Sequence, residues 1–364
     1  MRWETNRVRT FDLEREQAPA PQRSRGKGQR RRGKPKNQLD GWIVLDKPSG
    51  LTSTQALSAV KRLFNPEKAG HAGTLDPIAT GLLPLAFGEA TKTVPYVVDG
   101  AKSYQFTVRW GAATATDDTE GDVIATSDVR PTRDQIEAML PRFVGEISQV
   151  PPRYSAVKVD GQRAYDLARE GTVVELKPRV VTVTRLVIVG DPTEDEVTLV
   201  ADCGKGTYVR SIARDLGEAL GTCAHVTALR RTRVGPFREE DMITLDALRE
   251  RAVDPQAAIE AVLRDPADAL LGLPEMDVDR NAAGRLRRGQ GALLRPGDPM
   301  LAEDSEICAR EGGKLVALCR AQAGELRPVR VFRAPRRRIT VPIVAPSERA
   351  EAPEPRAAVS EFDD

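Results

Sequence analysis

The sequence reads GHAGTLDP from Gly70 to Pro77, and these eight positions hold one of only two histidines in the chain. Two glycines and a closing proline are unfavourable inside a helix. The stretch therefore predicts a shaped loop that presents Asp76, with Leu75 beside it as an apolar anchor. Catalytic groups are often carried by loops held on a rigid scaffold. An Asx turn, in which Asp76 bonds its own backbone, is the more ordinary interpretation of such a loop, and the surrounding sequence decides between the two.

The chain of 364 residues is long enough for two domains, and 40% of its residues are hydrophobic, which suffices for a substantial core. No apolar run approaches the roughly 20 residues that span a bilayer, and the first residues, MRWE, do not begin a signal peptide. We therefore expect a cytoplasmic protein without membrane contact. The four cysteines form no Cys-x-x-Cys pair and, with only two histidines, no zinc set, so we expect free thiols and no metal.

Basic residues are concentrated near the N-terminus. From Arg23 to Lys36 there are eight Lys or Arg and no acid, although the formal net charge of the whole chain is only +2. Such a segment cannot bury enough apolar area to fold, so residues 1–38 are expected to form a disordered basic arm. The arm either keeps the protein soluble or attracts RNA phosphates weakly. Residues 335–364, rich in Ala, Pro and Glu, are expected to form a disordered tail without an assigned function.

Helices and strands are mixed between these two ends. Thr52 with Gln55, and Thr132 with Gln135, form capping-box patterns that predict the starts of two helices, and a third helix is expected at 209–220. Apolar runs and alternating patterns predict strands at 42–45, 103–110, 180–189, 196–203 and 224–234. Hairpin-like neighbours outnumber strand–helix–strand units, so the sequence predicts an α+β fold with a mixed, mostly antiparallel sheet.

Seven other stretches surround residues 70–77 in a fixed order. They are GWIVLDKPSGLTS (41–53), GLLP (81–84), GEATK (88–92), KSY (102–104), TDDTEG (116–121), VPPRYSAVK (150–158) and GTYVRS (206–211). Together these stretches resemble the motifs of the TruB family of bacterial tRNA pseudouridine synthases, over about residues 39–273. The resemblance implies an isomerase that converts uridine-55 in the T-loop of tRNA to pseudouridine.

The resemblance also implies a domain organisation. Residues 39–273 would form the pseudouridine synthase catalytic domain, with an insertion at about 149–171 that clamps the RNA. A composition break at Gly272-Leu273-Pro274 would separate it from a small PUA-like β-barrel domain at 274–334 that binds RNA. The elements expected there are an arginine-rich helical stretch at 285–288 and short strands at 292–294, 315–318 and 328–332.

The resemblance assigns three catalytic residues. Asp76 corresponds to the essential aspartate of the family, Arg210 to the arginine that pairs with it, and Tyr104 to the tyrosine that stacks on the target base and takes part in proton transfer. A carboxylate is an established covalent nucleophile at sugar-like centres. A hydrolase would normally need a second carboxylate to activate water, and the nearest acids in sequence are only Glu67 and Glu89. A solitary aspartate agrees better with isomerisation.

Further residues are expected to bind the substrate. His71 would pack against the flipped nucleotide, Tyr208 would stack or hydrogen-bond, and Asp118 would lie at the edge of the active site. The remaining positions are the apolar Leu229 and the candidates for phosphate contacts, which are Lys47, Lys92, Lys158, Arg153, Arg230 and Arg231. The uridine has to leave its stack to reach a carboxylate. The expected partner is the T-arm of tRNA, bound by a monomer that needs no cofactor and no protein partner.

Three other functions remain open at this stage. The chain could be chiefly an RNA-binding chaperone that folds tRNA, with catalysis secondary. It could be an N-glycosidase, which would release free uracil from RNA. It could also be a related synthase directed by guide RNA, which would need guide and scaffold proteins; the C-terminal unit argues against this last function.

Overall fold

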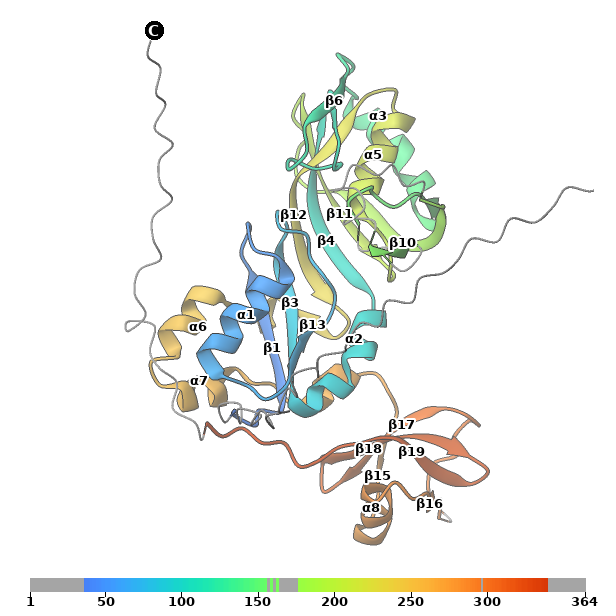
Figure 1. Ribbon diagram of the computed structural model, residues 1–364. Helices are drawn as coiled ribbons and strands as arrows, with labels where there is room; N and C mark the ends of the chain where they lie inside the picture. The colour runs from blue at the N-terminus through green and yellow to red at the C-terminus, as the bar shows by residue number, and fades with distance from the viewer. Residues whose placement is uncertain (1–35, 156–157, 160–161, 164–175, 296, 340–364) are drawn as a thin grey trace, which may run out of the picture. The chain divides into compact units, whose positions relative to one another are not determined.

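The computed structural model of the protein describes residues 36–155, 158–159, 162–163, 176–295 and 297–339 (Figure 1). Within them, a ten-stranded mixed sheet has the order β14-β1-β3-β12-β4-β11-β10-β7, with β13 paired to β12 and β2 paired to β3. Its strands are β1 (Gly41–Lys47), β2 (Ala69–His71), β3 (Thr80–Phe87), β4 (Lys102–Trp110), β7 (Gly145–Gln149), β10 (Arg179–Ile188), β11 (Glu196–Cys203), β12 (Ala224–Val234), β13 (Phe237–Arg238) and β14 (Ile243–Thr244). Only the β1–β14 and β3–β12 pairs of this sheet are parallel in the described residues. The predicted α+β fold with a mostly antiparallel sheet is confirmed.

The helices of this part begin where the capping patterns predicted. The side chains of Thr52 and Thr132 each accept a hydrogen bond from the backbone N–H three residues on. The side-chain oxygens of Gln55 and Gln135 accept from the backbone N–H of these threonines, so both capping boxes form. The α-helices are α1 (Ser53–Phe64), α2 (Val94–Asp99), α3 (Arg133–Met139), α5 (Val209–Ala219), α6 (Leu245–Arg251) and α7 (Pro255–Val262), and the short 3-10 helices are η1 (Gly88–Lys92), η2 (Leu140–Phe143), η3 (Glu239–Asp241) and η4 (Pro266–Leu270).

Both faces of the sheet are covered around β1. Ile43 and Leu45 belong to the larger core cluster, together with residues of α1, α5, α6 and α7. Trp42 and Val44 belong to a second cluster with residues of α2, β13 and η4. Burial on both faces explains why β1 is a continuous apolar run, whereas β4, with exposed Gln105 and Arg109, alternates.

The C-terminal unit has its own sheet and core. Its elements are β15 (Glu275–Asp277), α8 (Arg280–Arg287), β16 (Ala292–Leu293), β17 (Glu306–Glu311), β18 (Lys314–Gln322) and β19 (Glu325–Val331), with strand order β15-β17-β18-β19-β16. Leu286 of α8 packs with Ile307, Val316 and Leu326 of the sheet. A small sheet closed by one helix is consistent with the expected PUA-like barrel.

Three expectations about boundaries need comment. Gly70 and His71 do not lie in the loop, because they pair in β2 with Ala86 and Leu85 of β3. Part of the expected basic arm is packed: the side-chain amide of buried Asn37 donates to the carbonyl of Phe64. The start of the expected tail is also packed, since residues 336–339 bond to Asp40 and Gln256.

The rest of the arm, the rest of the tail and most of the expected insertion lie outside the described residues. Of the insertion, residues 149–155 and a short pair of strands, β8 (Lys158–Val159) and β9 (Gln162–Arg163), are described. A second short pair, β5 (Ala112–Thr114) and β6 (Val123–Thr126), carries the acidic loop between them. None of the helices in the described ranges has the length and apolar composition that crossing a bilayer requires.

Candidate active site

Asp76 lies in the connection between β2 and β3, which is fixed by its neighbours on both sides. Leu75 is buried in the core, as expected for an apolar anchor, and Ser53 at the start of α1 bonds both its N–H and its carbonyl (2.8 and 3.2 Å). The carbonyl of Pro77 accepts from the N–H of Gly50 at 2.9 Å. The position of the Asp76 carboxylate is therefore set by buried backbone contacts.

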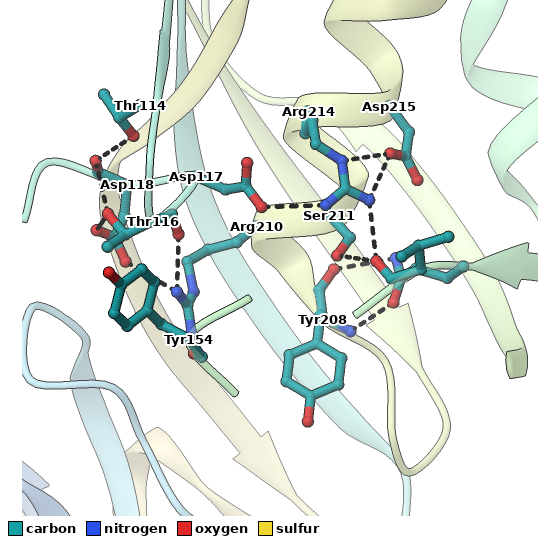
Figure 2. A network of polar contacts seen from close by, with 12 residues as sticks. Thr114, Thr116, Asp117, Asp118, Tyr154, Tyr208, Arg210, Ser211, Arg214 and Asp215 are labelled. Atoms are coloured by element: carbon teal, nitrogen blue, oxygen red, sulfur yellow. Dashed lines mark hydrogen bonds and ion pairs between the residues drawn. The ribbon is translucent and has the colours of Figure 1, made fainter. Parts of the chain in front are cut away.

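The carboxylate of Asp76 pairs with Arg210, at 2.9 Å between Oδ2 and Nη2. Arg210 lies in the first turn of α5 and its side chain is only 5% exposed. Its guanidinium also pairs with Asp118 at 3.2 Å and donates to the carbonyls of Thr116 and Tyr154, at 2.8 and 3.1 Å (Figure 2). Because four acceptors surround this planar group, its orientation is determined, and so is the direction from which it meets Asp76.

Asp118, expected at the edge of the active site, is the second carboxylate on Arg210. Its side chain is 1% exposed and its Oδ1 accepts from the hydroxyl of Thr116 and, at 2.9 Å, from the N–H of Glu120. The expectation of a solitary acid is therefore incomplete, since the loop between β5 and β6 brings a distant carboxylate to the same guanidinium. Asp118 is buried and fully bonded, so it is not placed to activate water.

Burial and the positive charge of Arg210 act in opposite directions on the pKa of Asp76. Burial raises the pKa of its carboxyl, Arg210 opposes this rise, and the nearby Asp118 charge adds to it. An aspartate in such surroundings is less solvated than one on a surface, and its charged form depends on a specific cation. This is the kind of environment in which catalytic carboxylates are found.

Lys47 lies beneath the Asp76 loop and is completely buried. Its ammonium group donates to the carbonyls of Pro48, Leu51 and Pro77, at 2.9, 2.7 and 3.2 Å. Burial lowers the pKa of Lys47 to about 8, against the influence of Asp76. All three of its hydrogens are used, so the expected phosphate contact is not supported by this arrangement. Lys47 instead holds the loop.

Arg231 of β12 supports the same loop from the other side, and the sequence did not single it out for this role. Its side chain, 1% exposed, donates to the carbonyls of Leu82, Gly73 and Thr74, at 2.8, 3.1 and 3.4 Å. The available signal was its position two residues after Leu229, which predicts the same inward face of a strand.

Tyr104 of β4 stands opposite Arg231 in the sheet register and is buried with 9% of its surface exposed. Burial raises the pKa of its phenol, an effect that Arg231 opposes. Leu229, two residues before Arg231, is buried opposite Phe106. His71 of β2 has a pKa lowered by burial and then by Arg231, so its imidazole is neutral near pH 7. These residues therefore occupy the surroundings of the loop.

Tyr208 is the N-cap residue of α5, two positions before Arg210. Its backbone N–H and carbonyl are both bonded by the side-chain amide of Gln149, at 2.8 and 3.0 Å, and Figure 2 shows its ring directed away from Arg214. Burial raises the pKa of the Tyr208 phenol. The backbone at the start of α5 is therefore fixed by Gln149, and the Tyr208 phenol is close enough to Asp76 and Arg210 to be influenced by their charges.

Of the other two expected contact residues, only Lys92 has a described side chain, and it lies apart from this cluster. Lys92 pairs with Glu89, donates to the carbonyl of Val331 at 2.7 Å and lies 5.6 Å from the ring centre of Phe332. Lys158 begins β8, and its side chain lies outside the described part of the chain. The structure thus brings together Asp76, Arg210 and Asp118, with Lys47 beneath the loop, and does not join Lys92 to them.

Two family models match the chain in succession. The model described as TruB family pseudouridylate synthase, N-terminal domain, matches residues 61–209. The model described as tRNA pseudouridylate synthase B C-terminal domain matches residues 210–271. Asp76 and Asp118 fall in the first match, and Arg210 is the first residue of the second.

Curated relatives named tRNA pseudouridine synthase B are similar over most of the chain. The protein from Bradyrhizobium diazoefficiens is 54% identical over 300 residues, which cover 82% of this chain and 87% of the relative. The protein from Caulobacter vibrioides is 51% identical over 307 residues, which cover 83% and 98%.

Solved structures of related proteins have a similar fold. A chain of an H/ACA RNP bound to a substrate RNA containing 2′-deoxyuridine matches with a TM-score of 0.63 and 26% identity, over 81% of this chain and 85% of that one. A Cbf5–Nop10–Gar1 complex matches with a TM-score of 0.62 and 28% identity, over 81% and 84%. The similarity in fold therefore covers most of the chain.

Proposed function

Because the chain belongs to the TruB family of tRNA pseudouridine synthases, we propose that it isomerises uridine-55 in the T-loop of tRNA to pseudouridine. The observation that carries this proposal is the pair formed by Asp76 and the buried Arg210, at 2.9 Å, on a loop fixed by the core. Both residues are those that the family motifs assign to the reaction.

In the proposed reaction, the bond between C1′ of the ribose and N1 of uracil breaks, the base turns over, and C1′ bonds to C5. The proton on C5 leaves as N1 gains one, so substrate and product have the same composition and no water is consumed. Asp76 acts at the ribose, where a carboxylate can form a covalent intermediate or relay a proton. Arg210 keeps Asp76 ionised and oriented, since the charge-assisted contact favours the carboxylate.

The target uridine is proposed to leave its stack before the reaction. Extrusion costs a few kcal/mol, and stacking on an aromatic ring offsets about 1–3 kcal/mol of this cost. Tyr104, with 9% of its surface exposed, is the proposed stacking surface, and His71, Tyr208 and Leu229 are proposed as further contacts of the base. Because burial raises the pKa of Tyr104, its phenol stays protonated at neutral pH and can donate a hydrogen bond.

The wider organisation is proposed from the same family membership. The part of the chain at 39–273 carries catalysis, the insertion at about 149–171 clamps the RNA arm, and the unit at 274–334 binds RNA as a PUA-like domain. The solved Cbf5 structures are complexes with Nop10, and one of them also contains Gar1. We propose that the present chain acts as a monomer, without a cofactor or a protein partner.

The test is incubation of the purified chain alone with an unmodified tRNA transcript, followed by chemical mapping of pseudouridine. The wild-type protein should modify the T-loop uridine and release no free uracil. Asp76→Asn should lower the rate by at least about a thousand-fold and leave tRNA affinity within about threefold of wild type. Asp246→Asn, the same change at a carboxylate 84% exposed on α6, is the control.

Each alternative function predicts a different result in this assay. Release of uracil would identify an N-glycosidase, and modification at another position would overturn the substrate assignment. Full tRNA refolding activity without any pseudouridine would favour the chaperone, as would equal performance of wild type and Asp76→Asn. A requirement for added guide RNA or proteins would contradict the proposal that the chain acts alone.

A further inference from the structure

A second arginine of α5 forms an ionic contact beside the Asp76 pair. Arg214 lies four residues after Arg210, one turn along the same face of the helix. Its Nη1 is 3.1 Å from Oδ2 of Asp117 (Figure 2). The consecutive acids Asp117 and Asp118 of the β5–β6 loop therefore pair with two arginines, one turn apart on α5.

The backbone of Asp117 is held in the conformation that this double contact requires. Its φ is +60°, in the left-handed region where Asp and Asn are tolerated better than other side chains. Its N–H donates to the carbonyl of Thr114 at 3.2 Å, and its carbonyl accepts from the N–H of Val226 at 3.1 Å. Neighbouring side chains of an extended segment point in opposite directions, and the turn at Asp117 allows both acids to face α5.

Carboxylates outnumber guanidinium groups around Arg210. Asp76, Asp117 and Asp118 are three carboxylates near two guanidinium groups, and the side chains of Asp117 and Asp118 are only 14% and 1% exposed. Asp117 also interacts electrostatically with Arg210, in addition to Arg214. Little water is available to screen the charges of Asp117, Asp118 and Arg210, so the partner of each of these groups matters.

We propose that Arg214 is a positioning residue: by pairing with Asp117 it leaves Arg210 to the carboxylates of Asp76 and Asp118. This inference rests on the proposed function. Without Arg214, the Asp117 carboxylate has no partner of its own and competes for Arg210, and the direction from which Arg210 meets Asp76 is no longer determined. Arg214 does this without touching the substrate.

A purely structural role for Arg214 is the competing explanation. Arg214 also pairs with Asp215 of the same helix at 2.8 Å and donates to the carbonyl of Val150 at 2.9 Å. The contact with Val150 fixes the segment after β7 to α5. The two roles differ in what removal of the Asp117 charge does. If competition for Arg210 is the defect, adding Asp117→Asn to the Arg214→Gln protein should raise kcat again. If loss of the anchoring contacts is the defect, adding Asp117→Asn should lower kcat further.

The experiment compares Arg214→Gln, Asp117→Asn and the double variant in kcat and KM on an unmodified tRNA transcript. Asparagine tolerates the left-handed backbone, so the second substitution removes charge with little change in shape. Arg214→Gln should lower kcat about tenfold to a hundredfold, with KM within about twofold of wild type. The double variant should return to within about threefold of Asp117→Asn alone. Arg214→Lys, which keeps the charge, should retain an intermediate kcat and replaces Arg214→Gln if that variant does not fold.

Arg130→Gln is the matched control. It removes an ion pair with Asp195, at 2.7 Å, that joins the segment after β6 to the residue before β11 and does not involve Arg210. Its kcat should equal that of wild type. Thermal unfolding of every variant separates loss of rate from loss of fold. A double variant as slow as Arg214→Gln or slower, or a change in KM alone, overturns the inference.

A second measurement does not depend on turnover. The side-chain ¹⁵N resonances of Arg210, assigned by their loss in Arg210→Lys, should shift in Arg214→Gln and return towards the wild-type position in the double variant. Unchanged resonances in Arg214→Gln overturn the inference. If the wild-type protein makes no pseudouridine, the proposed function fails, and these resonances alone decide the role of Arg214.

Discussion

At Lys47, a positive charge is buried directly beneath the loop that carries Asp76. Burial without an ion pair is unfavourable for an ammonium group, and it is tolerated here because three carbonyls accept its hydrogens. One of these carbonyls belongs to Pro77, the residue after Asp76. The cation therefore contributes to the shape of the Asp76 loop as well as to its electrostatics.

The lowered pKa of Lys47 predicts how stability depends on pH. The pKa falls from 10.5 to about 8 in the folded protein, so between these values the unfolded chain binds more protons than the folded chain. The free energy of unfolding of the wild type, relative to Lys47→Met, should therefore rise as the pH increases from 8 to 10.5, by on the order of 3 kcal/mol. Urea unfolding of both proteins across this range measures the difference. A difference that stays constant with pH would contradict the burial of a charged Lys47.

At the scale of elements, the contact between β3 and β12 supports the loop. These strands are parallel, with Gly81 of β3 paired to Arg231 of β12, whose side chain bonds the carbonyls of Gly73 and Thr74. Gly81 has a φ of +94°, and a Cβ there would lie 2.3 Å from the carbonyl oxygen of Arg231. The close approach of the two backbones therefore requires glycine.

Gly81→Ala should destabilise the protein by about 3–5 kcal/mol, because it adds a backbone clash to an unfavourable φ. Gly145→Ala is the matched control: its φ is +101°, and nothing lies within 4 Å of the added Cβ. The control should be destabilised only by the unfavourable φ, by about 1–2 kcal/mol. Chemical denaturation measures both. Equal losses would show that the two backbones relax around the added Cβ, and would contradict the requirement for glycine at position 81.

Much at this scale could be predicted from the sequence, because it depends on short-range patterns. The capping boxes at Thr52 and Thr132 and the alternation of residues 103–110 gave the correct elements. The short strand β2 was not predicted, since three residues with a glycine carry no strand signal. The pairing of β12 between β3 and β4 could not be predicted either, because alternation specifies which face of a strand is buried and not which strands pair with it.

The site could be predicted only in part, for a related reason. The Asp76–Arg210 pair followed from family motifs, and the structure shows the two side chains in contact. Lys47 and Arg231 were candidates for phosphate contacts, which require side chains at the surface. Their burial depends on carbonyls contributed by segments remote in sequence, which residue type and local pattern do not reveal.

At the scale of the whole molecule, the chain has more than one hydrophobic core. The ten-stranded sheet packs its helices over one set of buried residues, and the C-terminal sheet and α8 pack over another. The C-terminal unit exposes four arginines on or directly after α8, namely Arg280, Arg285, Arg287 and Arg288. Arg285 bonds the carbonyl of Gly291 and Arg287 pairs with Glu311, whereas Arg280 and Arg288 extend the positive surface.

If the C-terminal unit binds RNA as proposed, replacing Arg280 and Arg288 with Gln should weaken tRNA binding and reduce its dependence on salt. Each phosphate contact adds nearly one to the slope of log affinity against log salt concentration, so the slope should fall by up to about two. The kcat should stay unchanged, because neither residue contacts the Asp76 network. Arg249→Gln with Arg251→Gln removes the same charge from exposed positions of α6 and is the control. If the C-terminal unit binds RNA, the salt slope should fall more in the α8 double variant than in the α6 double variant. An equal fall in both would mean that the arginines of α8 contribute only to the overall charge.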